Sequence, residues 1–539
     1  MARVTSAAGA GSPASDTQRS RATPVPEPPR LGRRIALAAV QTIATRFVLR
    51  GIGLVSTLIL VRLLAPADFG VVSLASAVYA ILDLLTQTGF TLAIVRMTAP
   101  QRRHYDTAWT LGVIRGLLIA LGLVLTSGTQ ARLMGDPRIA PLMWLLAGTA
   151  ILQSLESARL IDCQRDLRFD RLMRYAIAGK LAGFCIVLPL AYVMRNAWPL
   201  LLSGFFARLV VIPYSYALAP YRPRLSLAAW PELFHFAKWL TLGNLAGVVE
   251  AQLMNFVLGH YVGLRAVGYY QVVRQLAALP ISEIAAPIRE PAFAGFSRLR
   301  HDIDALRRHF LAGLGLQCVV ILPLSAGVAV TAPDLVALFL GPGWAAAAPL
   351  LPAIALYALF DALAHYTHDI FVVLDRQRGY TIGYFATLVL RLPLTVWAAM
   401  RFGVQGAVLA MLASGVVNLV LWALLARPLL RFSWRDLRAA GGRSVLAAAV
   451  LSATVLLLGT ALGGPAGGWW ARALHLAAKV AIGAIAYGAA LLLLWRVAGA
   501  PAESAEADAL RGAANLFRQA GRATVRFAVI SRVRERGRG

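Results

Sequence analysis

The stretch SVLAAAVLSATVLLLGTALG, residues 444–463, has twenty residues and no charged side chain. A helix rises about 1.5 Å per residue, so about 20 apolar residues are needed to cross the hydrocarbon core of a bilayer. A helix also satisfies its own backbone hydrogen bonds, for which no water is available at that depth. The stretch therefore predicts a membrane-spanning helix.

The same unit, about twenty apolar residues followed by a short polar connector, repeats along the chain in both directions from this stretch. We expect an all-α, polytopic integral membrane protein with about fourteen transmembrane helices. The expected spans are 38–62, 70–94, 106–127, 139–160, 173–194, 198–219, 238–259, 267–288, 310–332, 348–373, 381–400, 404–426, 444–463 and 471–495.

The composition excludes a soluble enzyme. Of the 539 residues 58% are hydrophobic and 14% are charged, whereas soluble proteins carry about 25% charged residues. The net charge of +28 would indicate a nucleic-acid partner in a soluble protein. In a membrane protein it indicates the excess of Lys and Arg in cytoplasmic connectors. We therefore expect the membrane, and no nucleic acid, as a partner.

Counting Lys and Arg in alternate connectors predicts the orientation. Of the 53 basic residues, 38 fall on the side that holds the N-terminal tail, 7 on the other side and 8 inside spans. Both termini are thus expected in the cytoplasm. The Pro- and Ser-rich residues 1–37 are expected to form a disordered tail, because they lack hydrophobic periodicity. The outer connectors are too short to fold into a separate domain.

A weak internal repeat predicts two lobes. Ala65–Gly70 and Gly263–Gly268 are offset by 198 residues, close to six spans, and both end in glycine before an apolar helix. Two pseudo-symmetric six-helix lobes are one common plan of transporters. The expected organisation is a tail 1–37, an N-terminal lobe 38–220, a C-terminal lobe 221–426, a basic connector with two further helices 427–496, and a basic cytoplasmic tail 497–539.

Basic residues inside the spans are the first functional signal. Each costs about 2.5–3.5 kcal/mol on insertion scales, so it tends to face a cavity or a partner. We expect Arg46, Arg50 and Arg274 to meet in a wet cavity that holds an anion, since a guanidinium donates paired hydrogen bonds to phosphate. Further candidates for the same role are Arg115, Arg208 and Arg391. For these three, as for Lys180 and Lys479, snorkelling or an interhelical ion pair is the favoured alternative.

Acidic and imidazole side chains inside the spans are candidates for coupling to an ion gradient. An alternative of equal weight for the tenth span is hydrogen bonding within the helix. In that span Asp361, His365, His368 and Asp369 form a stripe at i, i+4, i+7 and i+8. A metal site is not expected there, because the stripe lies on one helix and no other residues complete a ligand set. The candidates are Asp83, Glu250, Asp361, His365 and Asp369.

Motifs of enzymes are not found in the sequence. It contains no Gly-rich phosphate loop with its Lys, no paired cysteines and no nucleophile elbow. We therefore expect a transporter without a cofactor rather than an enzyme, and coupling to an ion gradient is a simpler drive than ATP hydrolysis.

Several motifs, taken in order, resemble those of a known family. Leu60–Gly70, LVRLLAPADFG, resembles the first-loop signature of bacterial polysaccharide and O-antigen (Wzx-type) flippases, which belong to the multidrug/oligosaccharidyl-lipid/polysaccharide exporter superfamily. The likeness covers about residues 40–430. Its other parts are Asp106–Thr110 with Arg115–Gly116, Asp166–Phe169, Tyr221–Leu225, Phe236–Leu240, and Pro291–Leu299 with Asp302.

The resemblance implies a flippase of the bacterial inner membrane. It would move an oligosaccharide linked to undecaprenyl diphosphate to the outer leaflet by alternating access, with a polymerase and glycosyltransferases acting in the same pathway. The apolar helices 444–463 and 471–495 would flank a groove for the polyprenyl tail, by analogy with lipid II flippases. The family commonly has an Asp before Asn255, where this chain has Met254; Glu250, one turn earlier, is a possible substitute.

Two other functions compete with this one. A multidrug exporter of the same superfamily usually takes cations, so acids should dominate its cavity, whereas bases outnumber acids in these spans. A membrane polysaccharide polymerase or glycosyltransferase typically has a large outer loop for catalysis, which the sequence lacks.

Overall fold

The fold is described from a computed structural model that places residues 29–86, 94, 95, 97, 100–166, 168–230, 247, 250–462, 468–501, 504–507 and 511. All regular elements among these residues are helices. They are α1 Pro29–Leu63, α2 Pro66–Leu85, α4 Arg102–Met134, α5 Ile139–Ser154, α6 Leu160–Arg165, α7 Phe169–Met194, α8 Trp198–Leu218, α10 Leu264–Leu299, α11 Ile303–Val330, α12 Ala332–Leu335, η1 Val336–Leu340, η2 Pro342–Leu350, α13 Leu351–Val373, α14 Gln377–Leu430, α15 Trp434–Leu462 and α16 Trp469–Val497.

Length and composition decide which of these helices can cross a membrane. Within the described ranges, nine helices are long and apolar enough to cross a bilayer, and α5 is a shorter apolar helix. Residues 250–261 are also helical. The all-α, polytopic fold is thus confirmed. Half of the expected span 238–259, the end of 70–94 and the motif at 236–240 lie outside the described residues.

Several helices are longer than the apolar stretches that predicted them. α1 begins at Pro29, inside the tail expected at 1–37, because a helix continues into water where its sequence allows it, and Pro is favoured in a first turn. The spans expected at 381–400 and 404–426 form the single element α14 with a kink at Gly403. There φ is 63° and ψ is −147°, a conformation that only glycine adopts without strain.

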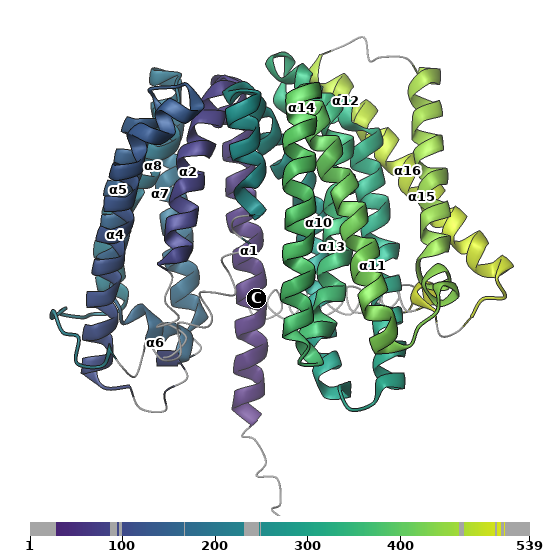
Figure 1. The fold of residues 1–539 in the computed structure, drawn as a ribbon, viewed down its shortest axis with the longest axis horizontal. Coiled ribbons are helices and arrows are strands. Elements are labelled where there is room, and N and C mark those ends of the chain that lie inside the picture. The colour runs from purple at the N-terminus through teal and green to yellow at the C-terminus, as the bar shows by residue number, and fades with distance from the viewer. Residues whose placement is uncertain are drawn as a thin grey trace, which may run out of the picture.

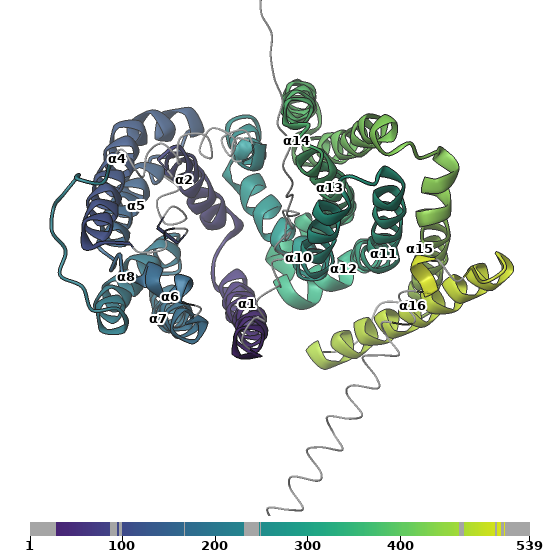
Figure 2. The same ribbon diagram turned by 90° about the horizontal axis from the view of Figure 1, so that it is seen from below.

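The helices form two groups. Figure 1 shows α2, α4, α5, α7 and α8 on one side and α10, α11, α13 and α14 on the other, and Figure 2 shows the same division from below. α1 packs along α7, while α15 packs on α11 and on α16. The last two helices therefore lie on the outside of the second group, and α16 runs obliquely along it in Figure 2.

The two groups meet where α2 packs on α10. A Cβ atom added to Gly70 would lie 1.9 Å from the carbonyl oxygen of Leu264, and one added to Gly268 would lie 1.8 Å from that of Pro66. The contact is reciprocal, because residues 66 and 70 precede 264 and 268 by the same 198 positions. Only glycine allows two backbones to approach so closely. The two turns noticed as a sequence repeat are therefore packed against each other.

An aromatic cluster covers this contact. Trp344, from the connector helix η2, is 2% exposed. Its indole N–H donates to the carbonyl of Val61 in α1 at 2.9 Å. Its ring meets Phe69 of α2 and Tyr269 of α10 edge-on, with centroids 5.4 and 5.8 Å away. One side chain thus bridges both lobes at the end where α2 and α10 touch.

Candidate functional site

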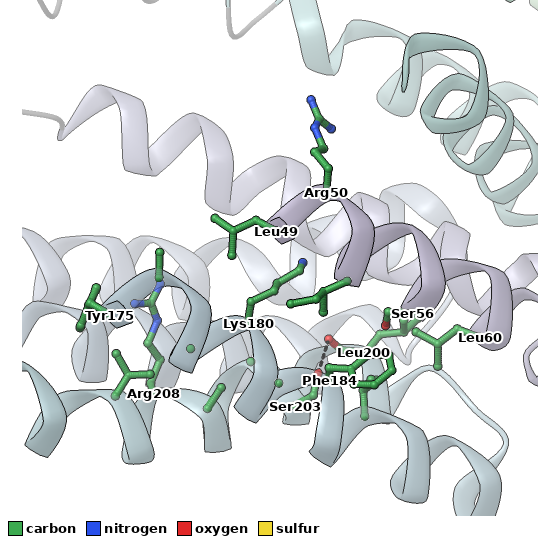
Figure 3. A pocket seen from close by; sticks show the side chains of 18 of the residues that line it. Leu49, Arg50, Ser56, Leu60, Tyr175, Lys180, Phe184, Leu200, Ser203 and Arg208 are labelled. Atoms are coloured by element: carbon green, nitrogen blue, oxygen red, sulfur yellow. Dashed lines mark hydrogen bonds between the residues drawn. The ribbon is translucent and has the colours of Figure 1, made fainter. Parts of the chain in front are cut away.

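A cavity of about 1080 Å³ lies between α1, α7 and α8 in the N-terminal lobe. Arg46 and Arg50 of α1, Lys180 of α7 and Arg208 of α8 line it. Figure 3 shows Lys180 extending from α7 toward α1 and Arg208 beside Tyr175, whereas Arg50 extends from α1 away from α7 and α8. Arg46, Lys180 and Arg208 therefore bring basic side chains from three helices to one space.

Small residues create this cavity. A Cβ atom on Gly179 would lie 3.2 Å from Val211, so α7 and α8 are close where this glycine lies. Gly204 of α8 lines the cavity and has open space where a Cβ would be. On the facing side, Gly53 of α1 leaves room for Lys180, whose Nζ would lie 3.5 Å from a Cβ there.

Lys180 differs from the other basic residues within the spans. Among the described residues it makes no ion pair with a carboxylate, and its side chain is exposed to the cavity. Arg46 and Arg50 are also exposed. A cluster of cations that acidic residues do not fully balance attracts an anion. Sequence reasoning favoured a structural role for Lys180; Gly183 at i+3, on the same helix face, was the available signal.

Arg208 is shared between the cavity and an acid. Its Nη1 donates to Glu156 Oε1 at 2.5 Å. The two side chains are 32% and 21% exposed, so the pair is reachable by water. Tyr175 lines the same cavity, and its hydroxyl is buried without a hydrogen-bond partner among the described residues. The remaining donors of Arg208 are therefore polar groups at the edge of the cavity.

Arg274 does not line this cavity. It is exposed on α10, donates to Gln271 Oε1 at 3.2 Å and lies over the ring of Tyr270. The next residue, Gln275, donates to Thr57 of α1 at 3.4 Å. Arg274 is therefore close to α1 but stands on the opposite lobe from Arg46 and Lys180.

Arg115 is paired within the N-terminal lobe. Its Nη2 lies 2.5 Å from Asp83 Oδ1. The pair lines a second, smaller cavity of about 290 Å³ between α2, α4, α5 and α6. There the hydroxyl of Tyr79 donates to Gln153 at 3.1 Å. Asp83, an ion-coupling candidate, and Arg115, an anion-binding candidate, thus hold each other.

Arg391 is the most buried of the arginine candidates, at 8% exposure. Its Nη1 lies 2.5 Å from Glu250 Oε1 and 3.1 Å from the hydroxyl of Tyr357. Tyr384 also donates to Glu250. This carboxylate, which the sequence offered in place of the family's Asp, is therefore neutralised by an arginine from α14.

The stripe on α13 divides into two parts. Asp369 forms a two-pronged ion pair with Arg289 of α10, at 2.7 and 2.8 Å. Sequence reasoning missed Arg289 because it counted the residue in a cytoplasmic connector. Asp361 instead faces His365, whose Nδ1 is 3.6 Å from Asp361 Oδ2, and it accepts a hydrogen bond from Tyr357 at 3.3 Å.

Lys479 of α16 pairs with Asp334 of α12, with 2.7 Å between Nζ and Oδ2. No group of three or more His, Cys, Asp and Glu side chains in the described ranges is placed to hold a metal ion. Of the basic residues predicted in the spans, four are therefore engaged by carboxylates, namely Arg115, Arg208, Arg391 and Lys479.

Comparison with known sequences agrees with the resemblance seen in the motifs. Residues 59–349 match the model of a family described as polysaccharide biosynthesis protein. The lipopolysaccharide biosynthesis protein WzxC of Escherichia coli (strain K12) is 24% identical over 421 residues, which are 75% of this chain and 83% of WzxC. The succinoglycan biosynthesis transport protein ExoT of Rhizobium meliloti (strain 1021) is 26% identical over 57% of this chain and 62% of ExoT.

Solved structures share the fold. The lipid II flippase MurJ in an inward closed conformation superposes with a TM-score of 0.66 at 13% identity, over 86% of this chain and 99% of MurJ. An inward-facing multidrug resistance transporter of the MATE family superposes with a TM-score of 0.56 at 16% identity, over 74% and 97%. The predicted membrane-transporter architecture is confirmed. Because the family model matches more than half of its residues, this chain belongs to the polysaccharide biosynthesis protein family.

Proposed function

We propose that this protein is a flippase that moves an oligosaccharide linked to undecaprenyl diphosphate from the cytoplasmic to the outer leaflet of the inner membrane. The transported unit would serve the synthesis of an exopolysaccharide, O-antigen or capsule. Glycosyltransferases would act before transport and a polymerase after it. Family membership and similarity to WzxC, a lipopolysaccharide biosynthesis protein, and to ExoT, a succinoglycan biosynthesis transport protein, support the pathway.

The observation that carries the proposal is the basic cavity between α1, α7 and α8. Arg46, Lys180 and Arg208 present guanidinium and ammonium groups to one space within the membrane-spanning helices. A diphosphate brings multiple negative charges and several acceptor oxygens, which such groups bind strongly. A cationic drug would be repelled by the same groups, so the site disfavours the multidrug alternative.

The lobes suggest how access alternates. They touch through Gly70 and Gly268 and are covered there by Trp344. With both termini in the cytoplasm, as the distribution of basic residues favours, this contact lies at the outer end of the helices. The structure then corresponds to a state closed toward the outside, and transport requires this contact to separate.

For coupling to an ion gradient, Asp361 and His365 are the proposed pair. Asp83, Glu250 and Asp369 each form an ion pair with an arginine, so each already has a cationic partner. Asp361 faces only the neutral Tyr357 hydroxyl and His365 in the contacts described above. Replacing Asp361 and His365 together by Asn should abolish gradient-driven translocation in proteoliposomes while leaving substrate binding. Undiminished translocation would remove the pair from the mechanism.

The function is tested in cells that make the polysaccharide. The double variant Arg46→Gln and Lys180→Gln should lose surface polymer and accumulate the lipid-linked unit at the inner leaflet, with an unchanged amount of protein in the membrane. Arg195→Gln, an exposed cation at the end of α7 outside the cavity, is the matched control. Normal polymer together with altered resistance to cationic dyes would instead favour a drug exporter. Polymer formed in detergent by this protein alone from a labelled unit would favour an enzyme.

A further inference from the structure

The cavity between α1, α7 and α8 has two chemically different ends. At one end lie Arg46, Tyr175, Lys180 and Arg208. At the other end, Leu60 and Val187 belong to one apolar cluster against which Leu200 packs. The lining of α1 runs from residue 46 to residue 60, which is about 20 Å at 1.5 Å per residue. The cavity is thus a long crevice with charge at one end and mainly apolar side chains, with Ser56 and Ser203 among them, at the other.

A headgroup alone does not account for this shape. A site for a diphosphate and sugars would be polar throughout, yet Ile52, Phe184 and Val187 line the crevice beyond the cations. A molecule that carries an anion on a hydrocarbon chain matches both ends at once. Its anion pairs with the cations, and its chain covers the apolar side chains.

We propose that the first part of the polyprenyl chain lies in this crevice, along the apolar faces of α1, α7 and α8, with its diphosphate between Arg46 and Lys180. The proposal rests on the proposed function and adds the position of the lipid chain. It differs from the expectation that the chain follows the last two helices. The basic side chain midway along α16, Lys479, is already paired with Asp334 and offers no anchor for a diphosphate.

Glycine 204 gives the sharpest test. It lines the crevice on α8, and a Cβ there meets no atom within 4 Å. Gly204→Leu therefore fills the crevice without a backbone clash. Gly488→Leu is the matched control, since Gly488 is also helical with nothing within 4 Å and lies on α16. Phe184→Ser is a second variant, which makes the apolar end polar without adding volume.

The experiment measures binding to the full chain in phosphatidylcholine nanodiscs. The two probes are geranylgeranyl diphosphate, which has the chain, and inorganic diphosphate, which lacks it. Gly204→Leu and Phe184→Ser should weaken binding of geranylgeranyl diphosphate about tenfold or more, with inorganic diphosphate bound as before, and Gly488→Leu should change neither. Lys180→Gln should weaken binding of both probes.

The outcomes separate this proposal from the proposed function. If Lys180→Gln weakens both probes but Gly204→Leu and Phe184→Ser weaken neither, the chain lies elsewhere and only the present proposal is overturned. If Lys180→Gln, alone and combined with Arg46→Gln, leaves both affinities unchanged, the diphosphate site itself is wrong. If phosphatidylglycerol in the nanodisc displaces geranylgeranyl diphosphate at equal concentration, the crevice is a general site for anionic phospholipid and the proposal also fails.

Discussion

Replacing Gly70 by Ala is expected to open the contact between the lobes. The added Cβ would lie 1.9 Å from the carbonyl oxygen of Leu264 and 2.8 Å from its carbon. Both atoms belong to the backbone at the start of α10, so no side-chain rotation relieves the overlap. The helices must separate by more than 1 Å to reach an ordinary contact of about 3.3 Å.

The size of the effect follows from the cost of overpacking. Adding a methyl group to a close-packed interface costs about 1–3 kcal/mol. Each lobe is held together by its own helix contacts, so separation of α2 from α10 is the least costly response. That energy favours the separated state by about 5- to 150-fold, since each 1.4 kcal/mol is a factor of ten.

The assay is labelling of a cysteine hidden at the contact. Val267, beside Gly268, is 0% exposed. In a chain whose three native cysteines are replaced, Val267→Cys should react slowly with a water-soluble maleimide, and faster by that factor when Gly70→Ala is added. Gly51→Ala, which meets no atom within 4 Å, is the control and should leave the rate unchanged.

The reciprocal contact gives a second test of the same prediction. Gly268→Ala should act like Gly70→Ala, because its Cβ would lie 1.8 Å from the Pro66 oxygen. The double variant should cost less than the sum, since helices already separated by one methyl group have room for the other. An unchanged labelling rate and an unchanged melting temperature in Gly70→Ala would refute the whole argument.

Three other predictions concern stability in detergent. Glu156→Gln should lower the free energy of unfolding by about 1–3 kcal/mol, which is less than for a fully buried ion pair because water reaches this one. In thermal melts, adding Arg208→Gln should recover part of this loss. Trp344→Ala should cost about 3–5 kcal/mol by leaving a cavity between the lobes, measured by the same melts. Burial opposes ionisation of Glu506, but two hydrogen bonds from Arg443 outweigh it, and the pKa of Glu506 lies below its ordinary 4.5. The stabilisation from Glu506 is therefore present above pH 4.5 and lost as pH falls through the lower folded value; Glu506→Gln should flatten this part of the pH–stability curve, and an unaltered curve would show that the pair contributes nothing.

The membrane-spanning helices and the family followed from local pattern, whereas the bounds of the two lobes and the count of fourteen spans stay predictions. A run such as residues 444–463 has only one stable form in lipid, so hydrophobicity over twenty residues is enough to predict a helix. The repeat ending in Gly70 and Gly268 was also visible, although nothing in the sequence indicated that the two turns touch.

The charged residues needed the tertiary structure. Arg391 meets Glu250, which is 141 residues away, and Arg208 meets Glu156, which is 52 residues away, whereas Lys180 meets no carboxylate among the described residues. A sequence gives the depth of a charge within a helix but not the rotation of that helix against its neighbours. Because that rotation decides whether a guanidinium faces an acid or a cavity, packing alone determined which of these cations remain for a ligand.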